Sequence, residues 1–343
     1  MNRNNQITIS DIAEKAGTSK MTVSRVLNNH PYVNSKTRQK ITDLMKHLKY
    51  HPNPTAVNLS KMSPQTIALI IQHEHLFTTY YFSEVLQGVE KCADDHSFNL
   101  IIFNYSTRQE LEIDRITSWY YGKFIKGFLV LAPPQGSELV KRFKAEKIPF
   151  VVIGAHAGFN KVDFIDVENL NGAFHATEYL INLGHKNIGF IAGPADRGDA
   201  RERELGYRKA LSKYKLKFDP ENIVCGYFSE DRGYQAMMQL LSREPRVTAV
   251  FAANDLMAKG ALSAIRDSKL EVPRDISIIG FDDINVASQL YPPLSTVKQP
   301  MFRLGEEAAR FLIETDEKQK SKLTRVLPTE LIIRESCAHL WHF

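Results

Sequence analysis

The feature that most constrains this chain is a pair of short helical patterns close to its N-terminus, separated by a glycine. Between Ile9 and Ala16, apolar residues recur with the spacing of one buried helix face, and Thr8 is placed to cap this helix. Gly17 permits a sharp turn, and a second helix is expected over residues 20–27. Two short helices joined in this way are typical of a helix-turn-helix domain that reads DNA.

The second helix is predicted to carry the surface that contacts DNA bases. Ser19 can cap it, and Val23 and Val26 are expected to face the interior of the domain. A guanidinium on the outer face can pair with a guanine edge, whereas a thioether suits the methyl group of thymine. The outward side chains of this kind are Lys20, Met21 and Arg25.

The distribution of charge supports a nucleic-acid partner for the same region. Residues 1–63 contain ten Lys and Arg against three acidic residues, a net charge of +7. The remaining 280 residues carry 34 basic and 36 acidic side chains, a net charge of −2. A solvated basic face without a partner is the alternative, but here the charge coincides with helix-turn-helix spacing. We therefore expect double-stranded DNA as a partner.

A third helix and a linker are predicted to follow. Asn34 is a suitable cap, and the apolar stripe over residues 41–48 would close a three-helix domain near Tyr50. Prolines bound the segment 51–63, in which Asn53 and Pro54 could start a helix too short to be stable alone. We expect a DNA-binding domain over residues 1–50 and a hinge helix or linker over 51–63 that orders on binding.

Length and composition set the outer limits. A chain of 343 residues with 43% hydrophobic and 10% aromatic content is typical of two or three globular domains. The N-terminus is polar, no apolar run approaches the length of a membrane span, and three scattered cysteines offer no disulfide framework. We expect a cytoplasmic protein with no membrane partner.

From residue 66 onward the pattern changes to apolar runs that alternate with amphipathic helical stretches. This alternation predicts parallel sheets covered by helices on both faces, and two sheets suit the remaining length better than one. Ligands of such sheets bind beyond the carboxyl ends of the strands. The predicted strands are residues 67–71, 100–103, 127–131, 150–153, 188–191, 249–251 and 276–279.

Several side chains at these strand ends suit a polar small molecule. Asn254 and Asp282 each follow a predicted strand, and Arg203 lies near the start of the helix after another. An amide, a carboxylate and a forked donor together can pair with sugar hydroxyls or a carboxylate. Each has an ordinary alternative, because such residues often only cap helices and aromatic residues more often belong to the core. The candidate aromatic walls are Tyr81, Phe82 and Phe228.

Motifs with fixed spacing extend over nearly the whole chain and together resemble one family. They comprise residues 8–28, 50–53, Ala56, Leu59, 184–185, 193–194, Arg203, 206–207, 254–255, 280–283 and 292–299. This set resembles the LacI/GalR family of bacterial transcription regulators. Residues 73–81 and 150–154 are most similar to the maltose-repressor branch.

The resemblance implies an all-α helix-turn-helix head and an α/β core that resembles periplasmic sugar-binding proteins. That core has two doubly wound subdomains linked by three chain crossings. We expect the N-subdomain to comprise residues 64–163 with 294–323, and the C-subdomain residues 164–293 with 324–343.

The resemblance also implies two sets of contact residues. Leu59 falls where the family inserts a leucine into the minor groove, which would bend the duplex. Asp199 stands where some sugar-responsive relatives have a small hydroxyl residue, so it could favour a neutral, hydroxyl-rich ligand. The expected DNA contacts are Thr8, Ser19, Lys20, Met21, Thr22, Ser24, Arg25, Asn28, Asn53, Ala56 and Leu59. The expected effector contacts are His73, Tyr81, Phe82, Asp199, Arg203, Phe228, Asn254 and Asp282.

Three classes of function were weighed. A homodimeric repressor of carbohydrate-utilisation genes, switched by a sugar or oligosaccharide effector on a palindromic operator, explains head, hinge and core together. The alternative is a small-molecule-binding protein of the periplasmic type without a transcriptional role, which would need an export signal and no basic head. A nucleotide-dependent enzyme would need a glycine-rich loop after its first strand, which residues 72–78 do not contain. His73 and His75 alone are a weak metal motif, so we expect no enzyme activity, no cofactor and no metal.

Overall fold

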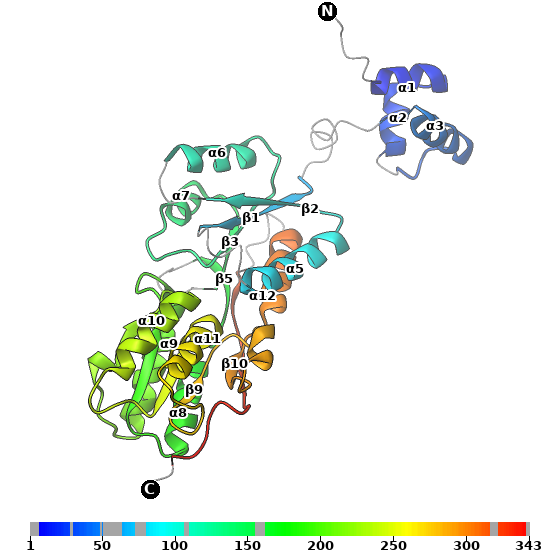
Figure 1. Ribbon diagram of the computed structural model, residues 1–343. Helices are drawn as coiled ribbons and strands as arrows, with labels where there is room; N and C mark the ends of the chain where they lie inside the picture. Colours follow the sequence, from blue (N-terminus) through cyan, green and yellow to red (C-terminus); the bar gives the residue numbers. More distant parts are fainter. Residues whose placement is uncertain are drawn as a thin grey trace, which may run out of the picture. The chain divides into compact units, whose positions relative to one another are not determined.

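The computed structural model describes residues 7–27, 30–48, 50, 64–72, 80–105, 110–154, 162–315 and 322–340. The chain divides into two compact units, residues 1–64 and 65–343, which are described separately (Figure 1). The first unit has its own small hydrophobic core, and the second contains three further core clusters.

The first unit is the predicted three-helix head. Its helices are α1 (Ile9–Ala16), α2 (Lys20–Leu27) and α3 (Ser35–His47). Thr8 and Asp11 form a reciprocal capping box at α1, and Gly17 ends this helix in the left-handed conformation with φ of 66°. Ile12, Val23 and Ile41, one from each helix, are fully buried against one another in the core of the head. The predicted turn, caps and buried stripes are therefore confirmed.

The second unit begins with a six-stranded parallel sheet in the order β11-β5-β4-β3-β1-β2. Its strands are β1 (Thr66–Ile71), β2 (Asn99–Asn104), β3 (Phe128–Leu131), β4 (Phe150–Ile153), β5 (Asp163–Val167) and β11 (Thr324–Leu327). The three central strands, β1, β3 and β4, are buried apolar runs, as expected of a parallel sheet covered on both faces.

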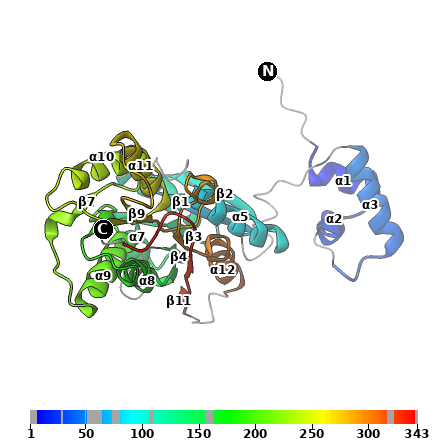
Figure 2. The same ribbon diagram turned by 60° about the horizontal axis from the view of Figure 1, so that its bottom comes forward.

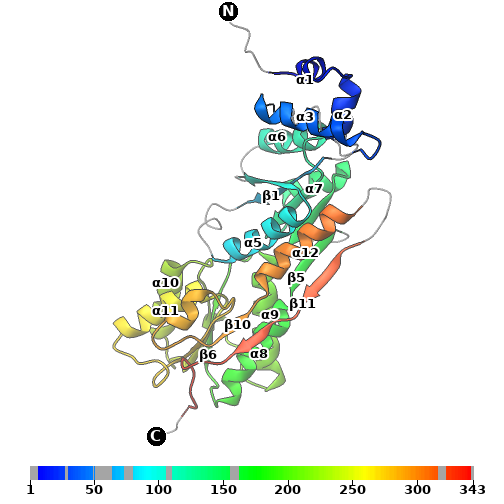
Figure 3. The same cartoon turned by 90° about the vertical axis from the view of Figure 1, so that its right-hand side faces the viewer.

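Two layers of helices cover this sheet. Side chains at alternate positions of β1 enter different cores, with Leu69 on one face and Ile70 on the other. The first face is covered by α5 (Tyr80–Asp95) and α12 (Met301–Glu314), which pack side by side (Figure 3). The opposite face is covered by α6 (Glu110–Tyr121) and α7 (Glu138–Glu146). We call this layered body the N-subdomain.

A second parallel sheet in the order β7-β6-β8-β9 forms the C-subdomain. Helices α8 and α9 pack together, as do α10 and α11, and the two pairs lie on opposite sides of the sheet (Figure 2). The strands are β6 (Ile188–Ala192), β7 (Ile223–Cys225), β8 (Ala249–Ala252) and β9 (Ser277–Ile279). The helices are α8 (Asn169–Asn182), α9 (Gly198–Lys213), α10 (Glu230–Leu241) and α11 (Asp255–Asp267), with short 3-10 turns at Pro220–Asn222 and Asn285–Gln289.

The predicted subdomain boundaries require correction. The chain crosses three times as expected, but β5 and β11 pair with the N-subdomain sheet, although residues from 164 and from 324 were assigned to the C-subdomain. Conversely, β10 (Thr296–Lys298) pairs with β12 (Glu330–Ile332), and its Val297 is buried in the C-subdomain core. Each predicted boundary therefore lies several residues too early in the sequence. In each case the chain completes a strand of one subdomain before it crosses to the other. The predicted hinge over 51–63 lies outside the described residues.

His185 anchors the C-terminal segment to the C-subdomain. Its ring is 2% exposed, with Nδ1 3.0 Å from the Thr248 hydroxyl and Nε2 3.1 Å from the carbonyl oxygen of Ala338. Nε2 also lies 3.0 Å from the Ser277 hydroxyl. A neutral ring protonated at Nε2 fits these partners, and burial lowers the pKa of His185.

Replacing His185 by Ala is expected to lower the free energy of unfolding by about 3 kcal/mol, because it opens a cavity and leaves buried polar groups without partners. Since the folded-state pKa is lowered, the wild-type chain should lose stability as the pH falls below the ordinary histidine value of about 6.5. The His185→Ala variant should lack this pH-dependent part of the loss in stability. Urea unfolding at pH 7.5 and 5.5 measures both effects, with the exposed His175→Ala as control. Equal losses in the two variants would contradict the anchoring role.

Candidate functional site

The head exposes the residues predicted to read DNA bases. On α2, Lys20 and Arg25 are exposed, and the Met21 side chain is 63% exposed although it is large and apolar. The Ser19 hydroxyl accepts a hydrogen bond from the Thr22 amide at 3.1 Å, which confirms Ser19 as the cap of α2. Thr8 is exposed at the start of α1, and Thr22 and Ser24 are half-buried on α2. The other predicted DNA contacts, Asn28, Asn53, Ala56 and Leu59, lie outside the described residues.

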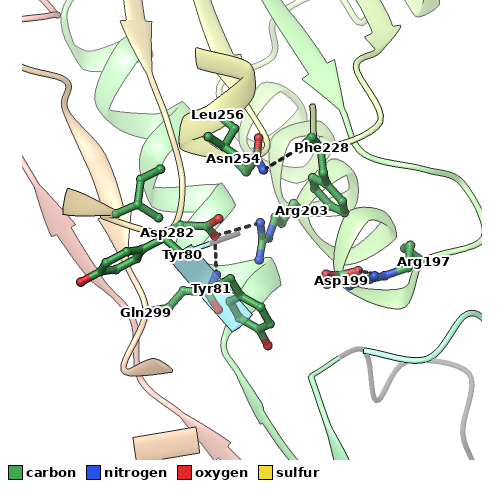
Figure 4. Close-up of a pocket in the computed structure, with 11 residues that line it drawn as sticks. Tyr80, Tyr81, Arg197, Asp199, Arg203, Phe228, Asn254, Leu256, Asp282 and Gln299 are labelled. Carbon is green, nitrogen blue, oxygen red and sulfur yellow. Dashed lines mark hydrogen bonds and ion pairs between the residues drawn. The ribbon is translucent and has the colours of Figure 1, made fainter. Parts of the chain in front are cut away.

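The core unit contains a cavity where its two subdomains meet (Figure 4). Its empty space amounts to about 500 Å³, a volume that includes open solvent at its mouth. Most of its lining follows the carboxyl ends of β6, β7, β8 and β9, and the start of α5 contributes the wall from the N-subdomain. The lining residues are Tyr80, Tyr81, Arg197, Asp199, Arg203, Phe228, Asn254, Leu256, Asp282, Ile284 and Gln299.

Arg203 and Asp282 form a buried ion pair at the cavity wall. Nη1 of Arg203 is 3.4 Å from Oδ1 of Asp282, and the two side chains are only 5% and 11% exposed. Nε of Arg203 donates to the side-chain oxygen of Asn169 at 3.0 Å, and the guanidinium stacks on the Phe281 ring at 3.8 Å. Arg203 is therefore a buried residue of the cavity wall and does not belong to an exposed surface ion pair.

Asp282 is held at the junction of the subdomains. Gln299, just before α12, also donates to its Oδ1, and Figure 4 shows Arg203 and Gln299 both directed at this carboxylate. Burial raises the pKa of Asp282 to about 6, although Arg203 and Gln299 act in the opposite direction. Behind it, Asp255 is fully buried and accepts hydrogen bonds from the Thr296 hydroxyl and from the Ile284 amide at 2.9 Å. Burial, and then repulsion by Asp282, raises the pKa of Asp255 well above its usual range.

A second ion pair, between Arg197 and Asp199, lies on the opposite side of the cavity. The guanidinium contacts the carboxylate in a bidentate manner, with Nε–Oδ1 at 3.1 Å and Nη2–Oδ2 at 2.8 Å. Burial alone would raise the pKa of Asp199, but Arg197 and Arg203 outweigh it and hold the pKa below its usual range. The carboxylate is therefore ionised and the pair carries no net charge.

The turn that carries this ion pair also joins the two subdomains. The Gln135 amide of the N-subdomain donates to the carbonyl of Asp196 at 2.8 Å. Nη1 of Arg201 donates to the side-chain oxygen of Gln135 at 2.7 Å. Thus Asp196 and Arg201 contact the N-subdomain. Arg197 and Asp199, which lie between these two residues in the sequence, face the cavity.

An aromatic ring separates the two arginines. The Phe228 ring centroid is 5.7 Å from the guanidinium carbon of Arg197 and 5.9 Å from that of Arg203. Gly193 is required beneath this ring, because a Cβ there would lie 2.3 Å from the ring edge. Phe228 has φ of 58° and Asp282 has φ of 118°, both in the left-handed region that L-residues rarely adopt. Strained backbone of this kind is concentrated at functional sites.

Six of the eight predicted effector contacts line this one cavity: Tyr81, Asp199, Arg203, Phe228, Asn254 and Asp282. Asn254 is also the N-cap of α11, so this residue both lines the cavity and fulfils the ordinary role of a helix cap. The expectation for Phe82 is not supported, because its side chain packs in the N-subdomain core and Tyr80 lines the cavity in its place. His73 lies outside the described residues.

The sequence-based prediction missed Arg197, Tyr80, Leu256, Ile284 and Gln299. Two signals were available. Gln299 ends the recognised motif at 292–299, and Arg197 lies three residues after the 193–194 motif and two residues before Asp199.

The structure also bears on metal ions and membranes as partners. Among the described residues, no three His, Cys, Asp or Glu side chains are arranged to hold a metal ion. The weak motif at His73 and His75 lies outside these residues. Likewise, none of the helices in the described ranges is both long and apolar enough to span a membrane.

Comparison with known proteins identifies both units. Residues 8–53 match the family described as "Bacterial regulatory proteins, lacI family", and residues 177–337 match a periplasmic binding protein-like domain. The HTH-type transcriptional regulator CelR of Thermobifida fusca is 34% identical over 341 residues, which cover 98% of this chain and 100% of that protein. The chain belongs to the lacI family. It is therefore a helix-turn-helix transcription regulator with a periplasmic-binding-protein-like core.

Solved structures place this lacI-family regulator among full-length relatives. A transcriptional regulator CelR–cellobiose complex matches with a TM-score of 0.75 at 33% identity, covering 96% of this chain and 99% of the other. The lac repressor dimer bound to operator and the anti-inducer ONPF matches with a TM-score of 0.88 at 28% identity, covering 97% and 100%. These comparisons do not test the maltose-repressor branch, which stays a prediction.

Proposed function

We propose that this lacI-family regulator is a repressor of carbohydrate-utilisation genes that binds a palindromic operator as a homodimer. A sugar or oligosaccharide in the cavity between the subdomains is the proposed switch, and the cytoplasm is the proposed place of action. The observation that carries the proposal is the cavity itself, where two arginine–carboxylate pairs and an aromatic ring meet at strand ends in a chain with a DNA-reading head. The relatives support it, since one structure is a cellobiose complex and another an operator-bound dimer.

The proposed mechanism couples the cavity to the head through the orientation of the subdomains. An effector that contacts Tyr81 from the N-subdomain and Arg203 from the C-subdomain has a different affinity for each orientation of these walls. Binding then shifts the population of orientations, which changes the separation of the two hinge segments in the dimer and hence the operator affinity.

In the head, we propose that Lys20, Met21 and Arg25 contact base edges, and that Leu59 enters the minor groove at the operator centre. We assign no reaction, cofactor or metal to the cavity. Its charged lining residues are held in ion pairs, which suits recognition of a ligand and not proton transfer or nucleophilic attack.

The decisive experiment identifies operator and effector in turn. Duplexes selected from a random pool with the full-length protein are expected to contain a palindrome, and fluorescence anisotropy then measures their affinity in the presence of mono- and disaccharides. At least one saccharide is expected to change operator affinity by about tenfold or more, as a coupling of 1–3 kcal/mol implies. Selection of no palindrome would refute the dimeric operator, and a full saccharide panel without effect would refute the proposed effector class.

A further inference from the structure

The cavity presents hydrogen-bonding atoms that the protein itself leaves unoccupied. Nη1 of Arg197 and Nη2 of Arg203 have no hydrogen-bond acceptor among the described residues, although both side chains are more than nine-tenths buried. On the acceptor side, both donors to Asp282 use Oδ1, which leaves Oδ2 without a donor in the described part of the chain. Within the described ranges, Oδ2 of Asp199 accepts a hydrogen bond from Arg197 alone, and it has capacity for one more donor.

This combination of donors and acceptors is complementary to hydroxyl groups. A ligand hydroxyl both accepts and donates a hydrogen bond, so it can bridge an arginine N–H and a carboxylate oxygen at the same time. Burial, and then the charges of Asp166 and Asp199, raises the pKa of Tyr81, whose hydroxyl therefore stays protonated and adds another group of the same kind. The Phe228 ring supplies an apolar face between the two arginines.

The charges of the lining residues cancel within the cavity. Each of the two arginines is paired with a carboxylate at its own position, Arg197 with Asp199 and Arg203 with Asp282. A ligand carboxylate or phosphate that approached either arginine would therefore meet a negative charge beside it. Because each pair is neutral, no net positive charge replaces the hydration that a buried ligand anion loses, and this uncompensated desolvation costs several kcal/mol, or about a hundredfold or more in affinity.

We propose that Arg197 and Asp199 act together as the specificity determinant of this site, so that it accepts an uncharged, hydroxyl-rich ligand and rejects its anionic counterpart. Asp199 holds the Arg197 fork in place and neutralises it, and Arg197 then donates from Nη1 to a hydroxyl or ether oxygen of the ligand. This inference rests on the proposed function, because it narrows the class of saccharide that the cavity binds.

The test compares neutral saccharides with uronates in which one CH2OH group is a carboxylate. The pairs are methyl glucoside with methyl glucuronide and cellobiose with cellobiouronate, titrated into the full-length protein by calorimetry. The wild type is expected to prefer the neutral member by about a hundredfold or more. In Asp199→Asn the Arg197 charge is no longer cancelled, and the preference should fall by about tenfold or more. The matched control is Asp196→Asn, an exposed acid two residues before Gly198, whose weaker, solvent-screened effect on Arg197 should change the preference by less than about twofold.

If Asp199→Asn lacks a cooperative thermal transition, the double variant Arg197→Gln with Asp199→Asn removes both charges together. It should lose at least about tenfold in affinity for the neutral ligand, because a donor is shortened, and should gain no affinity for the uronate. A wild type that binds a uronate as tightly as its neutral partner, or an equal response of the Asp196 and Asp199 variants, would overturn the specificity role while leaving an effector-switched repressor intact. Failure of every saccharide to bind would instead overturn both the proposed effector class and this inference.

Discussion

A chain shortened to begin at Ser63 is expected to lose operator binding entirely while its core still folds and binds effector. The physical reason is that the head differs from the rest of the chain in charge and packs around a separate core. The net charge of +7 lies within residues 1–63, and the head has a hydrophobic core of its own that shares no residue with those of the remaining chain. Electrophoretic mobility shift of the selected operator and thermal unfolding of the shortened chain measure the two effects.

The full-length protein provides the control for this deletion. Its operator affinity should fall steeply as salt is raised from 50 to 200 mM, by roughly a thousandfold if about six phosphates are contacted. An operator affinity that is independent of salt, or that survives in the shortened chain, would show that the head is not the DNA-binding element.

Arg203→Ala is expected to produce the second large effect, in stability and in ligand binding together. Removal of one partner of a buried ion pair leaves the Asp282 charge uncompensated, which typically lowers the free energy of unfolding by about 3 kcal/mol or more. Loss of the donor fork should also weaken effector binding by about ten- to a hundredfold and so remove the transcriptional response. Urea unfolding and calorimetry with the identified effector measure these changes.

The pH dependence of the Arg203 variant distinguishes this explanation from general loss of packing. A carboxyl group whose folded-state pKa is raised destabilises the protein as the pH rises through that pKa. Arg203 lowers the pKa of Asp282, so its removal should raise this pKa above its wild-type value of about 6. The stability deficit should therefore be smaller at pH 5 than at pH 7.5.

Arg208→Ala is the matched control, because this arginine lies on the same helix in an exposed pair with Glu204. It should cost at most about 1 kcal/mol and leave effector binding unchanged. Equal effector affinity in wild type and Arg203→Ala would remove Arg203 from the site.

The fold could be predicted from the sequence where strands are central and apolar. The run at 67–71 appears as β1 and that at 249–251 as β8, both fully buried. The strands that were not predicted are short or polar. β5 contains Asp163 and Asp166, and three of the four residues of β11 are exposed at the sheet edge. Such strands are specified by the neighbour with which they pair, which local sequence does not reveal.

The candidate site was predictable to the extent that it depends on strand ends. Asn254 and Asp282 were found because ligands of parallel sheets bind beyond the carboxyl ends of strands. The errors concern residues in loops and at helix starts, where the direction in which a side chain points decides whether it lines the cavity. Successive residues of a helix differ by about 100° in direction, so Tyr80 and Tyr81 can line a cavity while Phe82 turns into the core. Sequence order alone does not set that rotation.

The turn from Asp196 to Arg201 belongs to the ligand cavity and to the contact between subdomains at the same time. Its two cavity-facing residues, Arg197 and Asp199, lie between the two residues that hold Gln135, all within six consecutive positions. We therefore expect occupancy of the cavity and the relative orientation of the subdomains to be coupled directly through this segment. By thermodynamic reciprocity, a change at Gln135, which is not among the lining residues of the cavity, is expected to alter apparent effector affinity through the fraction of molecules already closed. If the proposed mechanism holds, sensitivity to effector and tightness of repression depend on a single equilibrium, so a substitution that shifts this equilibrium is expected to change both together.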